Sequence, residues 1–388
     1  MRNILCLTIL LLLTACQHTA GIWQKYPPSQ LYADHHFTEP AAVLETADDI
    51  FRLPPATEAD IRQFINRQQD TQQRTKEILQ YIFFYANTGL SYEHTATTTA
   101  TETLQQREAN CLSLSILAYS LAKAAGIQAE FQDIQIPEYW VNSEGQSFLN
   151  GHVNLRLKAS SPANTVYTFI SRDVIVDFDP YVTRKTFPAE IISGNRIVAM
   201  FYNNKAAHAH SNGNSNLAYQ YYKAATLTDP EFAASWSNLA VLYREENLTE
   251  YAFNAYHHSL ALQPDSVNTL ANLAMLYRKT GNTDKAAELE RYVLLQRQNN
   301  PYYYVMLGDE SIPQQPAQAI KHYKKALTLN TNLHEAYFGL SKSYYLQGNI
   351  TLASHYMEKA RRSSSSQSEQ QRYQNKLQLL TQTTAYNP

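Results

Sequence analysis

Glycine is scarce in this chain, with 11 residues among 388, and neither a GxGxxG nor a GxxxxGK[ST] segment occurs. Because glycine-rich loops are the usual cradle for nucleotide phosphates, this shortage argues against a nucleotide-dependent enzyme, and no cofactor is expected. An excess of either charge is also lacking, since 32 Lys and Arg stand against 34 Asp and Glu. Without a broad basic field, the chain is not expected to bind nucleic acid.

Cysteine is scarce too, with three residues at positions 6, 16 and 111. Cys6 lies in the apolar run Ile4–Leu13, which follows Arg2 and is shorter than the about 20 residues that span a bilayer. Such a run is typical of a secretory signal peptide. The length of 388 residues, 44% of them hydrophobic, is ample for two or three folded domains.

The apolar run ends in Leu13-Thr14-Ala15-Cys16, which resembles the lipobox of bacterial lipoproteins. The resemblance implies that residues 1–15 are removed as a signal peptide, that Cys16 is acylated, and that the chain is anchored to a membrane of the cell envelope. Gln17 stands where an Asp would imply retention at the inner membrane, so we expect the outer membrane, facing the periplasm, in a Gram-negative host. The alternative is an ordinary signal peptide cut near Ala15 or Ala20.

Cys111 is the one thiol left once Cys6 is removed and Cys16 is acylated, so no internal disulfide is expected. Residues 16–55 carry scattered prolines and polar residues and are expected to form a tether between the lipid and the first domain. The neighbouring pair His35 and His36 is interpreted as tether surface. No metal site is expected, because the histidines lack further ligands in register with them.

Residues 56–195 are predicted to form an α+β domain with helices first and an antiparallel sheet second. The apolar segment 111–125, closed by Gly126, is expected to be its buried central helix. The Thr-rich stretch 95–103 is expected to be irregular. Further helices are predicted over residues 57–69 and 71–86, and strands over 127–136, 148–157, 166–170 and 174–178.

The rest of the chain repeats itself with a period of 34 residues. The recurring positions are Leu239, Ala240, Tyr243 and Ala252, then Leu273, Ala274, Tyr277 and Ala286, and later Leu340, Tyr344 and Ala353. A helical hairpin with this period resembles the tetratricopeptide repeat. The resemblance implies an all-α solenoid of four to five repeats over 199–366, followed by a capping helix and tail over 367–388. Its groove is expected to bind a protein or peptide partner.

A catalytic site is predicted around Cys111. This residue opens a predicted helix, where unpaired backbone N–H groups and the helix dipole favour a thiolate. His152 lies on a predicted strand whose alternation places His152, Asn154 and Arg156 on one face, and Asp177 ends a later apolar strand. A thiolate, an imidazole and an orienting carboxylate are the parts of a cysteine nucleophile site.

This order of Cys on a helix, His on a strand and Asp on a later strand resembles the transglutaminase-like superfamily, a branch of the papain-like fold. The resemblance implies Cys111 as nucleophile, His152 as general base and acid, and Asp177 as the orienting group, with Asp179 as the alternative third member. The segments 153–154 and 177–180 depart from the aromatic pair and the Asp-Pro-Thr of that family. Support is expected from Arg107, ahead of the nucleophile, and from Gln105 or Gln106, either of which would donate to an oxyanion beside the Cys111 backbone N–H.

Three functional hypotheses remain open at this point. In the first, Cys111 cleaves or transfers a peptide or glutaminyl amide through a thioester, and hydrolysis is favoured because water is abundant in the periplasm and no amine pocket is evident. In the second, the chain is a non-catalytic envelope adaptor that uses its repeats for protein–protein interaction. In the third, the repeats hand a polypeptide to Cys111.

Overall fold

The structure of the chain, a computed structural model, describes residues 23–38, 42–65, 74, 77–78, 80–81, 91–93, 96–143, 146–158, 173–178, 187–364 and 367–385. The chain divides into two compact units: unit 1 comprises Met1–Ile50 and Ser193–Gln296, and unit 2 comprises Phe51–Ile192 and Arg297–Pro388. This division cuts the predicted solenoid at residue 296, so it differs from the predicted domain boundaries. The predicted signal peptide and Cys16 lie outside the described residues. Among the helices that are described, none has the length and apolar character needed to cross a membrane.

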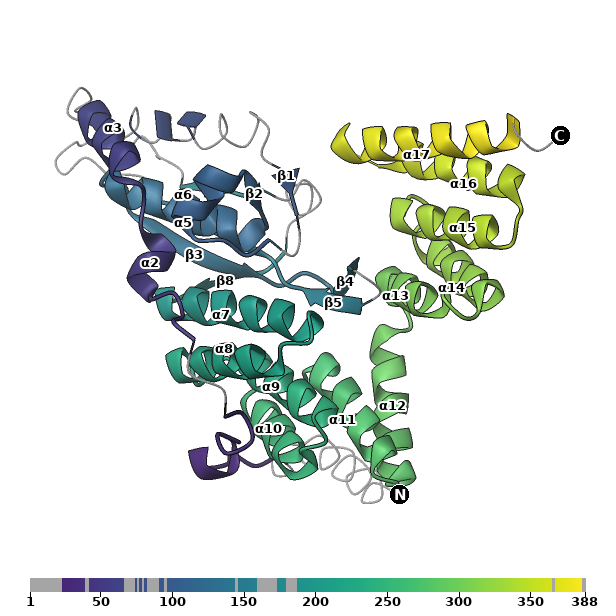
Figure 1. The fold of residues 1–388 in the computed structure, drawn as a ribbon, viewed down its shortest axis with the longest axis horizontal. Coiled ribbons are helices and arrows are strands. Elements are labelled where there is room, and N and C mark those ends of the chain that lie inside the picture. Colours follow the sequence, from purple (N-terminus) through teal and green to yellow (C-terminus); the bar gives the residue numbers. More distant parts are fainter. Residues whose placement is uncertain are drawn as a thin grey trace, which may run out of the picture. The chain divides into compact units, whose positions relative to one another are not determined.

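The first half of unit 2 combines helices with small sheets (Figure 1). Up to residue 192 the described elements are η1 (Pro28–Gln30), α2 (Ala47–Phe51), α3 (Pro55–Ile65), β1 (Ser91–Tyr92), α5 (Ala100–Gln106), β2 (Glu108–Ala109), α6 (Cys111–Ala124), β3 (Ala129–Ile134), β4 (Tyr139–Ser143), β5 (Gln146–Asn150), β6 (Val153–Leu157), β7 (Val174–Val176) and β8 (Ala189–Ile192). The order β7-β6-β3-β8 makes a four-stranded antiparallel sheet, β4 and β5 form a separate hairpin, and β1 and β2 are a short parallel pair. Helices thus precede antiparallel strands, and the papain-like relationship of this region stays a prediction.

Helix α6 is buried along most of its length, as its apolar composition predicts. The side chain of Asn110 caps its N-terminus by accepting a hydrogen bond from the backbone N–H of Ser113 at 2.9 Å. The hydroxyl of Ser115 donates to the carbonyl oxygen of Val153 at 3.2 Å, which ties the helix to β6. These bonds fix the first turn of α6, and Cys111 with it, beside the sheet.

Two local predictions for unit 2 are wrong. The stretch 95–103, expected to be irregular, contains the start of α5, because Thr99 and Glu102 form a capping box in which each side chain accepts from the backbone N–H of the other. The predicted strand 148–157 is interrupted at Gly151 and becomes β5 and β6. The predicted strand 166–170 and most of the predicted helix 71–86 lie outside the described residues.

From residue 194 the chain consists of consecutive helical pairs and a last helix, α17 (Gln367–Ala385) (Figure 1). The pairs are α7 (Gly194–Ser211) with α8 (Ser215–Thr228), α9 (Ala233–Glu245) with α10 (Thr249–Leu262), α11 (Val267–Lys279) with α12 (Thr283–Arg297), α13 (Pro301–Ser311) with α14 (Pro316–Leu329), and α15 (His334–Leu346) with α16 (Ile350–Ser363). The tetratricopeptide-like repeats are therefore confirmed. Their recurring side chains, such as Leu239, Ala240 and Leu273, are buried, which explains why these positions repeat in the sequence.

The described part of the predicted tether packs on the repeats of unit 1. We call residues 23–38 and 42–50 the N-terminal strap. The hydroxyl of Tyr243 on α9 donates to the carbonyl oxygen of Leu31 at 2.7 Å. The ring of Phe37 stacks on that of Tyr219 on α8, with centroids 4.2 Å apart. Because Leu31 and Phe37 are buried, this part of the chain is not the free tether that its prolines and polar residues predict.

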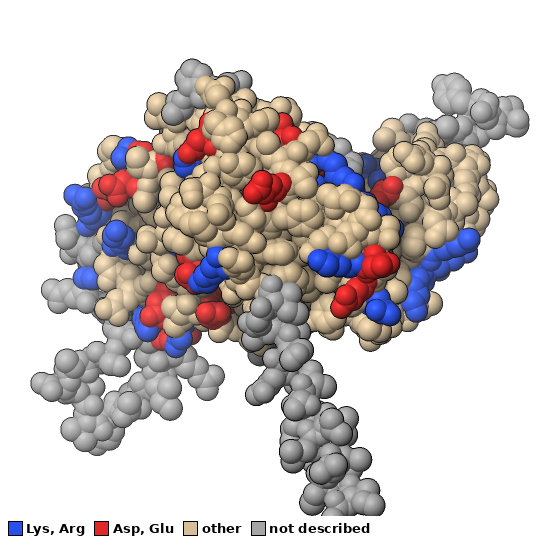
Figure 2. All heavy atoms as spheres, turned by 90° about the horizontal axis from the view of Figure 1, so that it is seen from below, with Lys and Arg blue, Asp and Glu red and all other residues tan. Residues whose placement is uncertain are grey.

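Charges of both signs are mixed on the surface, in agreement with the net charge of −2 (Figure 2). Many of them are paired within the described residues, as Lys205 and Glu45 are at 3.1 Å in unit 1. Residues 297–388 depart from the balance, because they contain ten Lys and Arg but only five Asp and Glu. The last repeats are therefore the basic part of the chain.

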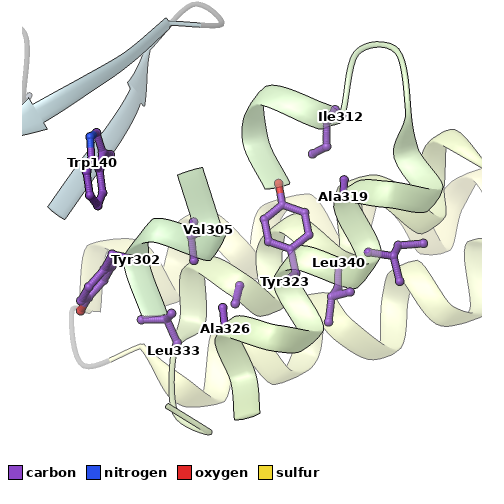
Figure 3. Packing of buried hydrophobic residues seen from close by; sticks show 11 residues of the cluster. Trp140, Tyr302, Val305, Ile312, Ala319, Tyr323, Ala326, Leu333 and Leu340 are labelled. Carbon is purple, nitrogen blue, oxygen red and sulfur yellow. The ribbon is translucent and has the colours of Figure 1, made fainter. Parts of the chain in front are cut away.

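The β4–β5 hairpin packs on α13, so that the α+β part and the last repeats of unit 2 share a hydrophobic cluster that includes Trp140 and Tyr302 (Figure 3). Two hydrogen bonds, of 2.6 and 2.7 Å, join the guanidinium of Arg297 to the carboxylate of Glu138. The same guanidinium lies 4.8 Å from the ring of Trp140. Since β5 is separated from His152 by a single residue, this contact joins the last repeats to the segment that carries the predicted imidazole.

Tyr323 on α14 fills the space that two glycines leave between helices of the last repeats (Figure 3). A Cβ atom added to Gly308 on α13 would lie 2.5 Å from the Tyr323 ring, and one added to Gly339 on α15 would clash with the same ring. The Tyr323 hydroxyl donates to Asp309 at 2.7 Å, so the ring is held in place. Glycine is therefore required at both positions for this packing.

Substituting either glycine is expected to destabilise unit 2. Gly308→Ala or Gly339→Ala should cost about 1–3 kcal/mol, because the Tyr323 ring has to leave its place to admit the methyl group. The thermal unfolding midpoint, followed by circular dichroism, should fall by about 2–4 °C per kcal/mol. Gly194→Ala is the matched control, since no atom lies within 4 Å of its added Cβ. A control that melts as early as the two variants contradicts the prediction.

Candidate functional site

Cys111 is the first residue of α6 and is buried, with 7% of its surface exposed. Its Sγ atom lies 4.0 Å from the carbonyl oxygen of Gly151, a distance at the outer limit for a thiol donor. The first N–H groups of a helix have no partner within the helix, so its N-terminus carries a partial positive charge. This position therefore favours a negatively charged sulfur.

His152 and Asp177 form a buried hydrogen-bonded pair beside this sulfur. The Nε2 atom of His152 lies 2.9 Å from both carboxylate oxygens of Asp177, and their side chains are 1% and 5% exposed. His152 is also hydrogen-bonded to Cys111. Because Asp177 occupies Nε2, Nδ1 is the ring nitrogen left for the sulfur. The structure thus brings together the three side chains that the sequence predicts as a catalytic group.

The protonation of His152 is set by two opposing effects. Burial alone would lower the pKa of His152, because it disfavours the charged imidazolium. The hydrogen bonds to Asp177 and to Cys111 outweigh burial and raise this pKa from 6.5 to about 10. At neutral pH the imidazolium is therefore the stable form, and it places a positive charge beside the Cys111 sulfur.

Asn154 belongs to the site, although the sequence analysis assigned it no role. Its side-chain N–H donates to Asp177 at 3.0 Å, so it holds the carboxylate that in turn holds His152. Arg156, two residues further along β6, pairs with Asp173 at the start of the neighbouring strand. The available signal was the alternation along β6, which places Asn154 on the same face as His152.

Other predicted site residues lie apart from this group or outside the described residues. Gln105 and Gln106 are exposed on α5, and neither is hydrogen-bonded to Cys111 in the part of the chain that the structure describes. Arg107 is also exposed and follows α5 in the left-handed region, with φ of 59°. Their supporting roles stay predictions. Asp179, the alternative third member, lies outside the described residues.

The group of Cys111, His152 and Asp177 supplies a nucleophile, a proton carrier and an orienting carboxylate. Nothing in its geometry requires a further group to activate the thiol, because the imidazolium and the helix N-terminus both act on the sulfur. Over the described residues, no set of three or more His, Cys, Asp and Glu side chains is arranged to hold a metal ion.

The raised pKa of His152 predicts a pH dependence of stability. Because the folded-state pKa of about 10 exceeds the ordinary 6.5, the imidazolium contributes fully below about pH 6.5, and its contribution is lost as the pH rises through about 10. The free energy of unfolding should therefore fall between these values. Urea unfolding at pH 6, 8 and 10 checks this, with Asp177→Asn expected to show a shallower fall. Parallel slopes for the two proteins would refute the role of the pair.

Comparison with known proteins finds similarity to solved structures over part of the chain. No protein-family model matches it, and no curated protein does. It is similar to the solved structure of PilF from Pseudomonas aeruginosa, with 20% identity over 49% of this chain and 87% of that chain and a TM-score of 0.28. It is also similar to YrrB, a tetratricopeptide-repeat protein with an unusual peptide-binding site, with 15% identity over 44% of this chain and 88% of that chain and a TM-score of 0.25. Yeast Tom70 is 15% identical over 48% of this chain and 40% of that chain, with a TM-score of 0.32.

Proposed function

We propose that the repeats bind a protein partner and that the chain acts as an adaptor in the cell envelope. Stacked helical pairs form surfaces that are suited to an extended polypeptide. The repeat helices of each unit expose large apolar side chains, among them Leu227 and Met275 in unit 1 and Tyr345 and Leu346 in unit 2. A bound partner would cover such side chains, and this exposed surface is the observation that carries the proposal.

The proposed location rests on the segment Leu13-Thr14-Ala15-Cys16. We propose acylation of Cys16 and anchoring in the outer membrane, facing the periplasm, if the host is Gram-negative. Metabolic labelling with a radioactive fatty acid tests this. Wild-type protein should be labelled and sediment with membranes, and Cys16→Ser should be unlabelled. Label retained by Cys16→Ser contradicts lipidation at this residue.

A second candidate function is thioester chemistry on the bound partner, and the hydrogen-bonded group of Cys111, His152 and Asp177 favours it. In this mechanism the Cys111 thiolate attacks an amide carbonyl carbon and forms a C–S bond. As the C–N bond breaks, the imidazolium of His152 gives its proton to the departing amine. Asp177 and Asn154 keep the imidazole in the orientation that both transfers need.

Release of the acyl group completes the cycle. Water gives a proton to the neutral imidazole of His152 and attacks the thioester carbonyl; the C–S bond then breaks, the carboxylic acid leaves and the thiolate forms again. An amine in place of water would give transamidation. Hydrolysis is the favoured outcome, because water is abundant in the periplasm and no sequence feature indicates a pocket for an amine.

Substitution of Cys111 separates the two candidate functions. Cys111→Ala removes the nucleophile and leaves the repeats intact, so cells that depend on an adaptor should be rescued by this variant as well as by the wild type. Cells that depend on thioester chemistry should not be rescued. A variant lacking α13–α17 tests the repeats in the same cells, and full rescue by that variant contradicts the adaptor function of these repeats.

A further inference from the structure

The last repeats carry lysines that no carboxylate neutralises. They are Lys321, Lys324 and Lys325 on α14, Lys342 on α15, Lys359 on α16 and Lys376 on α17. All six are exposed, and within the described residues none is ion-paired with Asp or Glu. The nearby carboxylates form ion pairs with arginines instead, since Arg361 and Arg362 both pair with Glu358, and Arg372 pairs with Glu369.

Two of these lysines lie over the same aromatic ring. The ammonium groups of Lys342, from α15, and Lys376, from α17, lie 5.7 and 5.5 Å from the centre of the Phe338 ring. Lysines 325 and 359 are similarly close to tyrosine rings, at 5.8 and 5.6 Å. A ring holds an exposed cation by about 0.5–1 kcal/mol, so these ammonium groups are partly ordered before any ligand arrives.

Phe338, which is half-buried against a hydrophobic cluster that includes Tyr373, lies at one end of a strip along α15. Phe338, Lys342, Tyr345 and Leu346 follow each other at helical spacing, so they lie on one side of the helix. Tyr345 and Leu346 are 48% and 56% exposed, which is high for such large apolar side chains. We call these four residues, together with Lys376, the α15 face. It combines positive charge with exposed apolar surface.

One acidic side chain acts on this face from α13. Asp309 interacts electrostatically with Lys342, although the two form no ion pair. Burial raises the pKa of Asp309 above its ordinary value, and the carboxylate accepts a hydrogen bond from the Tyr323 hydroxyl. Asp309 is therefore engaged within the repeat core and leaves both lysines of the α15 face available to an outside anion.

We propose that the α15 face binds an acidic segment of a polypeptide partner in which carboxylates alternate with apolar side chains. Two ammonium groups close to one ring match two carboxylates that are separated by an apolar residue. Tyr345 and Leu346 extend the apolar part of the contact. A polypeptide is favoured over an anionic membrane surface because Lys342 and Lys376 stand beside exposed apolar side chains, which match alternating carboxylates and apolar residues. The proposal rests on the adaptor function above and adds the chemistry of the partner.

A peptide-binding measurement tests the α15 face. The full soluble chain, residues 17–388, is titrated into a fluorescent peptide of alternating Glu and Leu, and the anisotropy gives the affinity. Lys342→Ala with Lys376→Ala should weaken binding about tenfold or more. Lys321→Ala with Lys324→Ala removes the same charge from α14 and is the matched control, with an expected change of about twofold or less. Lys342→Arg with Lys376→Arg should retain the affinity.

Several outcomes would overturn the proposal. Equal weakening by the two alanine pairs would mean unspecific attraction between charges. Binding to phosphatidylglycerol vesicles that needs Lys342 and Lys376, with peptide binding unchanged, would assign the face to a membrane. A peptide with Ser in place of Glu that binds the wild type equally well would leave the adaptor function standing and refute the acidic specificity. If the wild type binds neither peptide, the proposal that the α15 face binds an acidic segment is refuted. The adaptor function is tested separately, by whether the variant lacking α13–α17 rescues the cells.

Discussion

Replacing His152 with Ala is expected to slow the alkylation of Cys111 by iodoacetamide at pH 6 by about 30-fold. An ordinary thiol titrates near about 8.5, so only about 0.3% of it is thiolate at pH 6. In the wild type His152 places an imidazolium beside the Cys111 sulfur at this pH, because the pKa of His152 is raised to about 10. Loss of this positive charge is the physical reason for the expected slowing.

The measurement is the alkylation rate of the full soluble chain between pH 5 and 9. His208→Ala is the matched control, since His208 is an exposed residue of α7 and should leave the profile unchanged. Asp177→Asn should lie between the wild type and His152→Ala. If the wild-type thiol is unreactive at pH 6, or reacts as fast without His152, the thioester mechanism is refuted and the adaptor remains the better account.

Arg297→Ala is expected to lower the free energy of unfolding of unit 2 by about 3 kcal/mol. Arg297 is 5% exposed, and its bidentate bond to Glu138 is the charged contact between the β4–β5 hairpin and the last repeats. Loss of the guanidinium leaves a partly buried carboxylate without its cation and uncovers the Trp140 ring. Urea unfolding followed by the near-ultraviolet circular dichroism of the aromatic residues measures the change.

Two further variants make this test specific. Arg361→Ala removes a more exposed arginine, which pairs with Glu358, and should lower the free energy of unfolding much less than Arg297→Ala does. Replacing Arg297 with Met and Glu138 with Leu together removes both charges and should recover much of the loss, because no unpaired charge remains. Equal effects of Arg297→Ala and Arg361→Ala would contradict a special role for the hairpin contact.

The repeats could be predicted from the sequence because their packing is local. Each helix packs on its neighbours in the chain, so Leu239, Ala240 and Tyr243 recur in the next pair as Leu273, Ala274 and Tyr277. Helix α6 could be predicted for a similar reason, since a segment with hardly any polar residue has to be buried. Helix α5 was missed because threonine suggested irregular structure, although Thr99 and Glu102 have the spacing of a capping box.

The contacts that could not be predicted join distant parts of the chain. Glu138 and Arg297 are 159 positions apart, and Leu31 and Tyr243 are 212 apart. No periodicity connects such pairs, and a single sequence holds no record of which residues meet. The site could be predicted in part. The order of Cys111, His152 and Asp177 can be recognised in the sequence, whereas the hydrogen bond from Asn154 to Asp177 depends on how β6 pairs with β7.

The N-terminal strap would limit how far the first repeats of a lipid-anchored chain can move from a membrane. With acylation at Cys16, as proposed, seven residue steps separate the lipid from Trp23, the first residue of the strap, and a fully extended chain of that length reaches about 25 Å at most. The strap is held on unit 1 by contacts such as that between Phe37 and Tyr219, so its residues do not lengthen the connection between the lipid and unit 1. A partner of the repeats would then be met within a thin layer beside the bilayer, where a membrane-bound target has a far higher local concentration than one diffusing across the whole compartment.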